Sequence, residues 1–319
     1  MSAGNKRRVF VSAPLLGDAL ARLESVANVD VGKTSIGVKE LPSFDFDAVI
    51  AMLTDRIDDA FIARLPSLRL VANVAVGIDN VDLAACSARG VAVTNTPDVL
   101  TDATADLAFA LLLAAARRVG EGARGLRAGS FPKWTLETML GTAVHHRTLG
   151  LVGFGRIGQA MARRARGFEM NVLSPQRSPV APSVEAALGA TRVDLAELAA
   201  RSDFVSLHCP LTKETRHLFD EARFARMKRG AVFVNTARGG CVDELALARA
   251  LASGRLGGAG IDVFENEPTV APELLAQPRA VLTPHVGSAE LATRTEMARV
   301  AVDNVLAWID GMPLLTRVT

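Results

Sequence analysis

The sequence predicts an α/β fold of two parallel-sheet domains, one of them inserted into the other. Short apolar runs of strand type alternate with helix-type segments in the first third of the chain, and a second alternating series follows a polar stretch at residues 120–146. Strands and helices that alternate in this way form a parallel sheet covered by helices. The length of 319 residues is sufficient for two domains, and the apolar fraction of 49% suits strands buried on both faces.

The expected elements follow the chain in order. In the first series we expect strands at 8–11, 48–51, 70–73 and 91–93 and helices at 14–25, 58–65 and 83–89. A long apolar helix then ends near Arg117 and Arg118, and residues 120–146 are expected to be a loop-rich excursion. The second series has expected strands at 149–152, 170–173, 204–207, 231–234, 258–261 and 280–283, and helices at 159–166 and 292–311. We expect the last helix to return to the first domain, which then comprises 1–99 and 290–319, with 100–289 inserted.

A glycine motif opens the second series. Gly153, Gly155 and Gly158 lie between the apolar run 149–152 and the helix-type segment 159–166. Glycines at this spacing let the backbone turn sharply and approach a pyrophosphate, and the N–H groups at the start of the helix favour the anion. The motif therefore predicts a Rossmann-like, dinucleotide-binding domain.

The residues after the next strand bear on the type of dinucleotide. A carboxylate that binds the ribose 2'-hydroxyl of NAD is expected about 20 residues past the glycines. Residues 174–178 contain no carboxylate but include Gln176, Arg177 and Ser178. Arg177 can pair with a 2'-phosphate and Ser178 can donate a hydroxyl. We therefore expect NADP(H) to be preferred, with NAD(H) as the alternative.

Charge and cysteine content narrow the class of protein. The 36 basic and 34 acidic residues give a net charge of +2 without long runs of one sign, so neither nucleic acid nor an anionic membrane is an expected partner. The three cysteines, Cys86, Cys209 and Cys241, are scattered, which argues against a disulfide framework or a structural metal site and suits the cytoplasm. The apolar stretch 107–116 is about half the length of a membrane span.

Three titratable residues follow predicted strands of the inserted domain. They are Arg238, Glu267 and His285. Reduction of a 2-keto acid needs a proton donor for the carbonyl oxygen and an anchor for the carboxylate. His285 suits the acid, Glu267 would hold its ring and favour the protonated form, and Arg238 offers a guanidinium to the substrate. Together the three predict a 2-keto acid reductase.

Several segments resemble one known family across essentially the whole chain. Residues 76–82, 99–106, 210–215, 234–244, 262–268 and 283–288, with the glycine loop, are similar to the D-isomer-specific 2-hydroxyacid dehydrogenases. The resemblance implies that Arg238, Glu267 and His285 are catalytic and that the backbone at Val76 and Gly77 helps to hold the substrate carboxylate. Besides the glycines and 176–178, it implies cofactor contacts from Thr104, Arg156, Ile157, Cys209, Pro210, Thr215, Thr236, Ala237, Arg238, Asp262, His285, Gly287 and Ser288.

Residues 141–150 and the Arg177 loop resemble the bacterial glyoxylate/hydroxypyruvate reductases that also accept 2-ketoaldonates such as 2-ketogluconate. The leading hypothesis is thus an NADPH-dependent reductase of small 2-keto acids. A reductase of aromatic 2-keto acids such as hydroxyphenylpyruvate stays open, because the apolar Leu53, expected to face the substrate, admits either class. A relative that acts as a corepressor keeps the same triad, so a dinucleotide-sensing protein is the alternative of another class. The resemblance also implies a homodimer, formed through the helix at 102–119 and the excursion.

Overall fold

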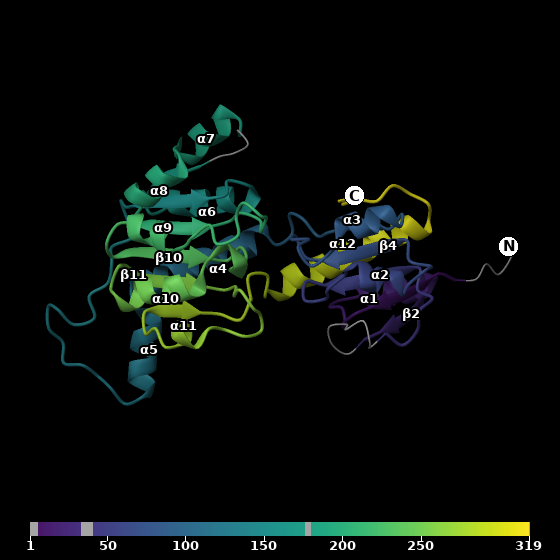
Figure 1. Cartoon of the computed structure of the whole chain (residues 1–319), viewed down its shortest axis with the longest axis horizontal. Helices are drawn as coiled ribbons and strands as arrows, with labels where there is room; N and C mark the ends of the chain where they lie inside the picture. Colours follow the sequence, from purple (N-terminus) through teal and green to yellow (C-terminus); the bar gives the residue numbers. More distant parts are fainter. Residues whose placement is uncertain (1–5, 33–40, 176–179, 319) are drawn as a thin grey trace. The chain divides into compact units, whose positions relative to one another are not determined.

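The computed structural model describes residues 6–32, 41–175 and 180–318, and it confirms the predicted α/β fold with two parallel sheets (Figure 1). The chain divides into two compact units. Unit 1 consists of Met1–Leu100 together with Ser288–Thr319, and unit 2 consists of Thr101–Gly287. The chain therefore leaves unit 1 after its fifth strand and returns to it with the last helix.

Unit 1 is built on a five-stranded sheet in which every pair of neighbouring strands is parallel, in the order β2-β1-β3-β4-β5. Its strands are β1 (Arg8–Val11), β2 (Asn28–Val31), β3 (Ala48–Met52), β4 (Leu70–Val74) and β5 (Ala92–Thr94). Its helices are α1 (Ala19–Val26), α2 (Asp59–Ala63), α3 (Leu83–Ala88) and α12 (Leu291–Ile309). Both faces of the sheet are buried. In β3, Val49 packs on the side of α2 and α3, whereas Ile50 packs on the side of α1 and α12.

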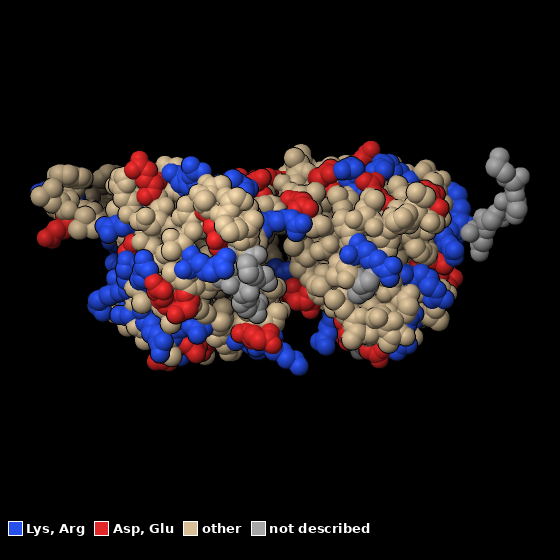
Figure 2. Space-filling model, turned by 90° about the horizontal axis from the view of Figure 1, so that it is seen from above, with Lys and Arg blue, Asp and Glu red and all other residues tan. Residues whose placement is uncertain are grey.

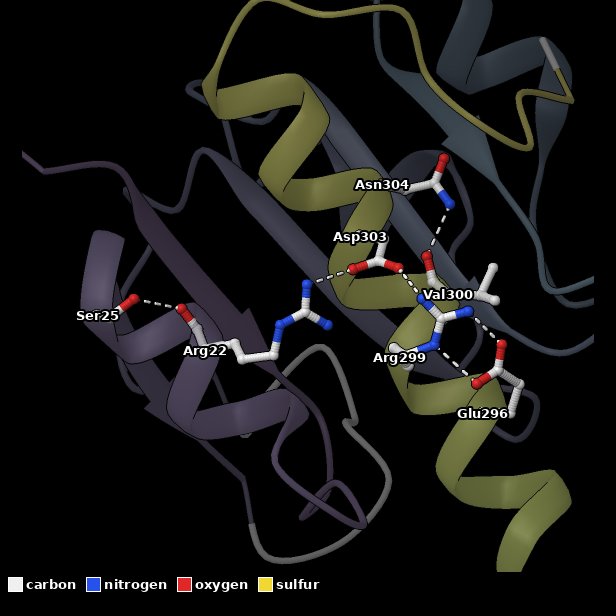
Figure 3. A network of polar contacts seen from close by, with 7 residues as sticks. All are labelled: Arg22, Ser25, Glu296, Arg299, Val300, Asp303 and Asn304. Atoms are coloured by element: carbon white, nitrogen blue, oxygen red, sulfur yellow. Dashed lines mark hydrogen bonds and ion pairs between the residues drawn. The ribbon is translucent and has the colours of Figure 1, made fainter.

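An ion pair connects α1 with α12, and further polar contacts lie within each helix (Figure 3). Arg22 of α1 lies 2.7 Å from Asp303 of α12, and Arg299 also pairs with Asp303 at 2.7 Å. Both arginines are well exposed, so these pairs add little to stability. Beneath them, Asn304 is fully buried and accepts the N–H groups of Leu315 and Thr316. The segment after α12 is thereby fixed against β5, where Val318 donates to the carbonyl of Val93.

Unit 2 is built on a seven-stranded parallel sheet in the order β12-β11-β10-β9-β6-β7-β8. Its strands are β6 (Thr148–Val152), β7 (Asn171–Ser174), β8 (Ala190–Arg192), β9 (Phe204–Leu207), β10 (Ala231–Asn235), β11 (Leu256–Ile261) and β12 (Ala280–Leu282). The chain starts in the middle at β6, runs outward through β7 and β8, and then resumes on the other side of β6 at β9. Ligands of such sheets bind beyond the carboxyl ends of the strands at this reversal.

Helices cover both faces of this sheet. The helices of unit 2 are α4 (Thr101–Ala116), α5 (Val119–Arg127), α6 (Arg156–Arg166), α7 (Pro182–Leu188), α8 (Leu195–Arg201), α9 (Glu221–Arg226), α10 (Glu244–Ala252) and α11 (Pro272–Leu275), with a 3₁₀ turn at Gly239–Cys241. Helices α4 and α6 pack on one face with Phe204 and Val234, and α8, α9 and α10 pack on the other face with Val205 and Phe233. Successive residues of one strand thus enter opposite cores, as expected for a sheet buried on both sides.

Two expectations about helices differ from the structure. The excursion at 120–146 is not loop-rich throughout, because α5 occupies its first part. Its glycines disfavour a helix, but Arg118 pairs with Glu121 at 2.6 Å in the first turn and Gly120 allows close packing near Val281. Helix α1 begins at Ala19 and not at residue 14, since Gly17 has a φ of 72° that interrupts a helix. Of the helices in the described segments, none has the length and apolar character needed to cross a membrane.

Candidate active site

The glycine loop follows β6 and leads directly into α6. Gly153 has a φ of 101°, and a Cβ atom there would lie 2.5 Å from the carbonyl oxygen of His208. A Cβ atom at Gly158 would lie 2.1 Å from the Gly153 carbonyl, whereas the space around Gly155 is open. Gly155 is also the N-cap residue of α6 and offers no side chain to the first turn. The loop therefore forms a backbone cradle at a helix N-terminus, which fits the pyrophosphate of a dinucleotide.

His208 lies beside this cradle at the end of β9. Its Nε2 atom is 2.9 Å from the hydroxyl of Ser206, and burial lowers the pKa of the imidazole to about 3. The ring is therefore neutral at physiological pH and adds no positive charge beside the glycine loop. The cradle relies on backbone N–H groups and on the dipole of α6.

Other expected cofactor residues also lie at the carboxyl ends of the unit 2 strands. Gly287 lies against both Thr104 and Asp262. A Cβ atom on Gly287 would lie 3.5 Å from the Thr104 hydroxyl and 3.4 Å from Asp262 Oδ2. The loop that begins with the buried Cys209 and the exposed Pro210 is closed by Thr215, whose hydroxyl donates to the Pro210 carbonyl at 2.7 Å. The buried hydroxyl of Thr236 has no hydrogen-bond partner among the described residues. A ligand with polar groups fits this position, because an unpaired buried hydroxyl is costly.

Part of the expected cofactor set lies elsewhere. Gln176, Arg177 and Ser178 are outside the described residues. The strand that precedes them, β7, ends at Ser174, whose hydroxyl donates to the carbonyl of Leu151 in β6. Ser288 is the first residue of the second segment of unit 1. In the described parts of the chain, no three His, Cys, Asp or Glu residues are grouped so as to hold a metal ion.

His285 and Glu267 form a hydrogen-bonded pair. His285 Nδ1 is 2.8 Å from Glu267 Oε2, and the other carboxylate oxygen of Glu267 accepts the N–H of Phe264 at 2.9 Å. Burial of Glu267 favours its neutral form, but the bonds from His285 and Phe264 and the charges of His285 and Arg238 outweigh it, so the pKa of Glu267 is below its usual value. The ionised carboxylate accepts the hydrogen bond at Nδ1 and thereby orients the ring. Nδ1 is occupied by this bond, so Nε2 is the ring nitrogen available to a ligand.

Asp262 holds the backbone that carries His285. The φ of His285 is 52°, a left-handed conformation that is uncommon for residues other than glycine. Asp262 supports it by accepting hydrogen bonds from the Thr283 hydroxyl at 2.6 Å, from Val286 N–H at 2.8 Å and from Gly287 N–H at 2.9 Å. Burial raises the pKa of Asp262 despite these donors. The segment from Thr283 to Gly287 is thus wrapped around one buried carboxyl group.

Arg238 lies on a segment that packs against the Glu267 loop. The side chain of Asn235, at the end of β10, donates to the Arg238 carbonyl at 2.9 Å and accepts the Ala237 N–H at 3.0 Å. Next in sequence, Gly239 touches the other loop so closely that a Cβ atom would lie 1.9 Å from the carbonyl carbon of Phe264. Arg238 and Glu267 are therefore kept adjacent by backbone packing, and the charge of Arg238 acts on Glu267.

Two residues that support this arrangement were missed by the sequence reasoning, Asn235 and Glu244. Glu244 is buried at the start of α10, and its carboxylate accepts the N–H groups of Glu265 and of Ala271, the latter at 3.4 Å. It thereby spans the loop that carries Glu267. In the sequence, Asn235 is a polar residue at the end of an otherwise apolar strand. Glu244 is a second acidic residue directly after the helix cap Asp243.

The remaining expected residues lie in unit 1. Leu53 follows β3 and is half-buried, and Val76 and Gly77 lie in the loop after β4. Both loops leave the carboxyl edge of the unit 1 sheet. The loops are connected by Asn80, whose side chain donates to the carbonyls of Met52 and Asp55 at 3.2 and 3.0 Å.

Comparison with known proteins identifies the family. Residues 109–287 match the family model described as the NAD binding domain of D-isomer specific 2-hydroxyacid dehydrogenases. This range covers the glycine loop and also Arg238, Glu267 and His285. The chain belongs to the D-isomer specific 2-hydroxyacid dehydrogenase family. It is therefore an oxidoreductase with a nicotinamide dinucleotide as cofactor, as the sequence predicts.

Members of this family with similar sequences include two curated reductases. The chain is 44% identical to a glyoxylate reductase of Pyrococcus horikoshii, over 96% of this chain and 94% of the relative. It is 46% identical to glyoxylate/hydroxypyruvate reductase B of Escherichia fergusonii, over 81% of this chain and 80% of the relative. Among solved structures, an NADPH-dependent glyoxylate/hydroxypyruvate reductase of Sinorhizobium meliloti, in complex with NADP and malonate, is similar with a TM-score of 0.86 and 34% identity, over 98% of this chain and 97% of that chain.

Proposed function

We propose that this protein is an NADPH-dependent reductase of small 2-keto acids, of the glyoxylate, hydroxypyruvate and 2-ketogluconate class, and that it forms D-2-hydroxy acids. The observation that carries the proposal is the hydrogen bond between His285 and Glu267 next to Arg238, in the dinucleotide-binding unit of a 2-hydroxyacid dehydrogenase. The names of the two curated reductases and of the solved NADPH-dependent reductase support the substrate class.

His285, Glu267 and Arg238 each have a separate role in the proposed reaction. The bound cofactor supplies the hydride for the carbonyl carbon. His285 donates a proton from Nε2 to the carbonyl oxygen, and the ionised Glu267 at Nδ1 stabilises the protonated ring before this transfer. Arg238 forms charge-assisted hydrogen bonds with the substrate and stabilises the negative charge that develops on the carbonyl oxygen. The proton lost by His285 is regained from solvent, so the ring is ready for the next turnover.

The preference for NADPH rests on residues 174–178, which contain Arg177 and Ser178 and lack a carboxylate. A 2'-phosphate would gain a guanidinium partner there without repulsion from an acid. The NADP complex of the Sinorhizobium meliloti relative supports this preference. NAD(H) is proposed as the weaker cofactor.

The direct test is oxidation of NADPH and NADH with a panel of glyoxylate, hydroxypyruvate, 2-ketogluconate, pyruvate, phenylpyruvate and hydroxyphenylpyruvate. We expect turnover of small acids with NADPH. His285→Gln should lower kcat by about 10²–10⁴-fold, because proton transfer to the carbonyl oxygen is lost. A higher kcat/KM for hydroxyphenylpyruvate would favour the aromatic class. NADPH binding without turnover of any acid would favour a dinucleotide-sensing protein.

For the assembly we propose a homodimer formed through α4, α5 and the segment that follows them. This segment exposes apolar side chains to an unusual degree, with Phe131 84%, Trp134 77% and Leu136 83% exposed. Next to it is a pocket of about 460 Å³ lined partly by Leu113, Leu140, Val144 and Phe168. Exposed apolar groups beside a pocket of mixed polar and apolar lining suit a two-fold interface, in which the same patch serves both subunits.

The surface charge and the cysteines bear on the partners and the location of the protein. Lys and Arg are interspersed with Asp and Glu over the face drawn in Figure 2, an arrangement that gives no support to nucleic acid as a partner. The three cysteines are all buried and form no disulfide bond, which agrees with the proposed cytoplasmic location.

A further inference from the structure

We propose that Asn73 and Asn95 are positioning residues that present three successive backbone N–H groups, those of Val76, Gly77 and Ile78, to the carboxylate of the substrate. The inference rests on the proposed function, because the family resemblance already implies that the backbone at Val76 and Gly77 holds the acid. What is new is the role of the two asparagines that orient this backbone. The two side chains do not touch the substrate. They determine the orientation of the peptide groups in this loop.

The loop after β4 has its carbonyl groups hydrogen-bonded one after another. Each of three successive carbonyl oxygens accepts one N–H donor at 2.9 Å: Ala75 from the backbone of Thr96, Val76 from the side chain of Asn95, and Gly77 from the side chain of Asn73. Two of the three donors are side-chain amides. The orientation of these peptide groups is therefore determined by side chains and not by the hydrogen bonds of the sheet.

Peptide geometry then places the N–H groups on the opposite side. In a trans peptide the carbonyl of one residue and the N–H of the next point in opposite directions. With the carbonyls of Ala75, Val76 and Gly77 held, the N–H groups of Val76, Gly77 and Ile78 face away from their donors. Within 6–32, 41–175 and 180–318, no residue accepts a hydrogen bond from any of the three. Val76 is also exposed. Successive N–H groups that are left without a protein acceptor can bind an anion.

The two asparagines are themselves fixed. Asn73 is fully buried, and its amide exchanges hydrogen bonds with the amide of Asn80 at 3.3 and 3.1 Å. Asn73 Nδ2 therefore donates one hydrogen to the Gly77 carbonyl and the other to Asn80. Both hydrogens are bonded, so the amide is held in one orientation. Asn95 is fixed through its backbone, whose carbonyl accepts the hydroxyl of Thr316 at 2.6 Å. The loop is therefore organised before the substrate arrives, which saves ordering entropy on binding.

The experiment replaces the donor amides by carboxylates of nearly the same shape, in Asn95→Asp and Asn73→Asp. Each variant puts an oxygen opposite a carbonyl oxygen, so the peptide turns and an N–H group is lost to the ligand. We expect the KM for glyoxylate and the inhibition constant of oxalate, a small dicarboxylate, to rise roughly tenfold. The dissociation constant of NADPH and the kcat at saturating glyoxylate should change less than about twofold, since neither depends on this loop.

The matched control is Asp58→Ala. Asp58 is the N-cap of α2 in the same unit, and its loss removes a structural hydrogen bond without touching the loop. It should leave the constants for glyoxylate and oxalate within about twofold of the wild type. Asn95 is only half-buried, so Asn95→Asp decides the matter if the buried Asn73→Asp does not fold.

Two results would overturn the inference. One is unchanged oxalate binding in a folded Asn95→Asp variant, and the other is an equal loss of oxalate and NADPH affinity. The proposed function is tested separately by wild-type turnover. If the wild type reduced no keto acid, calorimetry of oxalate binding to the wild type and Asn95→Asp would still decide the role of the asparagines, and no binding to the wild type would refute it.

Discussion

Gly239 and Phe264 are in backbone contact, and this contact joins the turn after β10 to the loop after β11. A Cβ atom on Gly239 would lie 1.9 Å from the carbonyl carbon of Phe264, which no real contact permits. The turn carries Arg238 and the loop carries Glu267, so the glycine determines how closely the two charged groups approach. Asn235 and Glu244 hold the two segments from either side.

We predict that Gly239→Ala separates these segments. The methyl group cannot be accommodated without a backbone shift, so we expect the variant to lose about 3 kcal/mol or more of its free energy of unfolding and at least about 10²-fold in kcat/KM. Gly122→Ala is the control, because a Cβ atom there meets only Met139 Cε at 3.7 Å within α5. Calorimetric unfolding and steady-state kinetics measure both variants. A Gly239→Ala protein with wild-type kinetics would contradict the role of this contact.

We predict that Glu267→Gln changes the dependence of stability on pH. The folded-state pKa of Glu267 is below the ordinary value of 4.5, so its ionised form stabilises the native state above that pH, and this contribution is lost as the pH falls through the lower, folded-state pKa. The variant should therefore be less stable than the wild type at neutral pH, and the difference should vanish in acid. Urea unfolding over a pH series checks this. A difference that stays constant in acid would show that the ion pair does not contribute.

We predict that Arg177→Ala lowers the preference for NADPH. Loss of the guanidinium should reduce kcat/KM with NADPH by roughly tenfold or more and leave kcat/KM with NADH nearly unchanged, because only NADPH carries the 2'-phosphate. Arg192→Ala is the matched control, since Arg192 on the adjoining strand β8 pairs with Glu185 at 2.8 Å. If both cofactors lost equal efficiency in Arg177→Ala, the assignment of the 2'-phosphate site would be wrong.

We predict that Trp134→Asp weakens the homodimer. A charge on this exposed apolar side chain would have to be buried at the interface, so the mass measured by light scattering should shift towards the monomer as the protein is diluted. Leu275→Asp introduces the same charge on another exposed residue, outside the patch, and should leave the mass unchanged. A wild-type monomer at all concentrations would refute the proposed assembly.

The parts of the fold that could be predicted are those with a strong burial pattern. Strands such as Ala48–Met52 and Ala231–Asn235 are apolar on both faces because helices cover both, and this produces a continuous apolar run in the sequence. The edge strands Asn28–Val31 and Ala190–Arg192 were not predicted. They contain polar residues and are partly exposed, so their pairing is decided by the neighbouring strand and not by their own composition.

The candidate site shows the same division. Arg238, Glu267 and His285 could be selected because charged residues after predicted strands meet at one edge of a sheet. Asn73, Asn95, Asn235 and Glu244 could not, since each acts on the backbone of a segment that the sequence does not place beside it. A lone buried amide or carboxylate leaves no periodic signal, and its role becomes visible only when its partners are in place.

The return of the chain to unit 1 has a consequence for synthesis. Helix α12 supplies Val302 and Val305 to the core beneath the unit 1 sheet, yet these residues are translated after all of unit 2. The nascent chain therefore has all of unit 2 available before unit 1 can close its core. Until then the apolar surfaces of β1, β3 and β4 on this side have α1 but not α12 packed against them. The core of unit 1 is completed only when α12 has been translated. We expect a chaperone to bind the nascent protein before that stage.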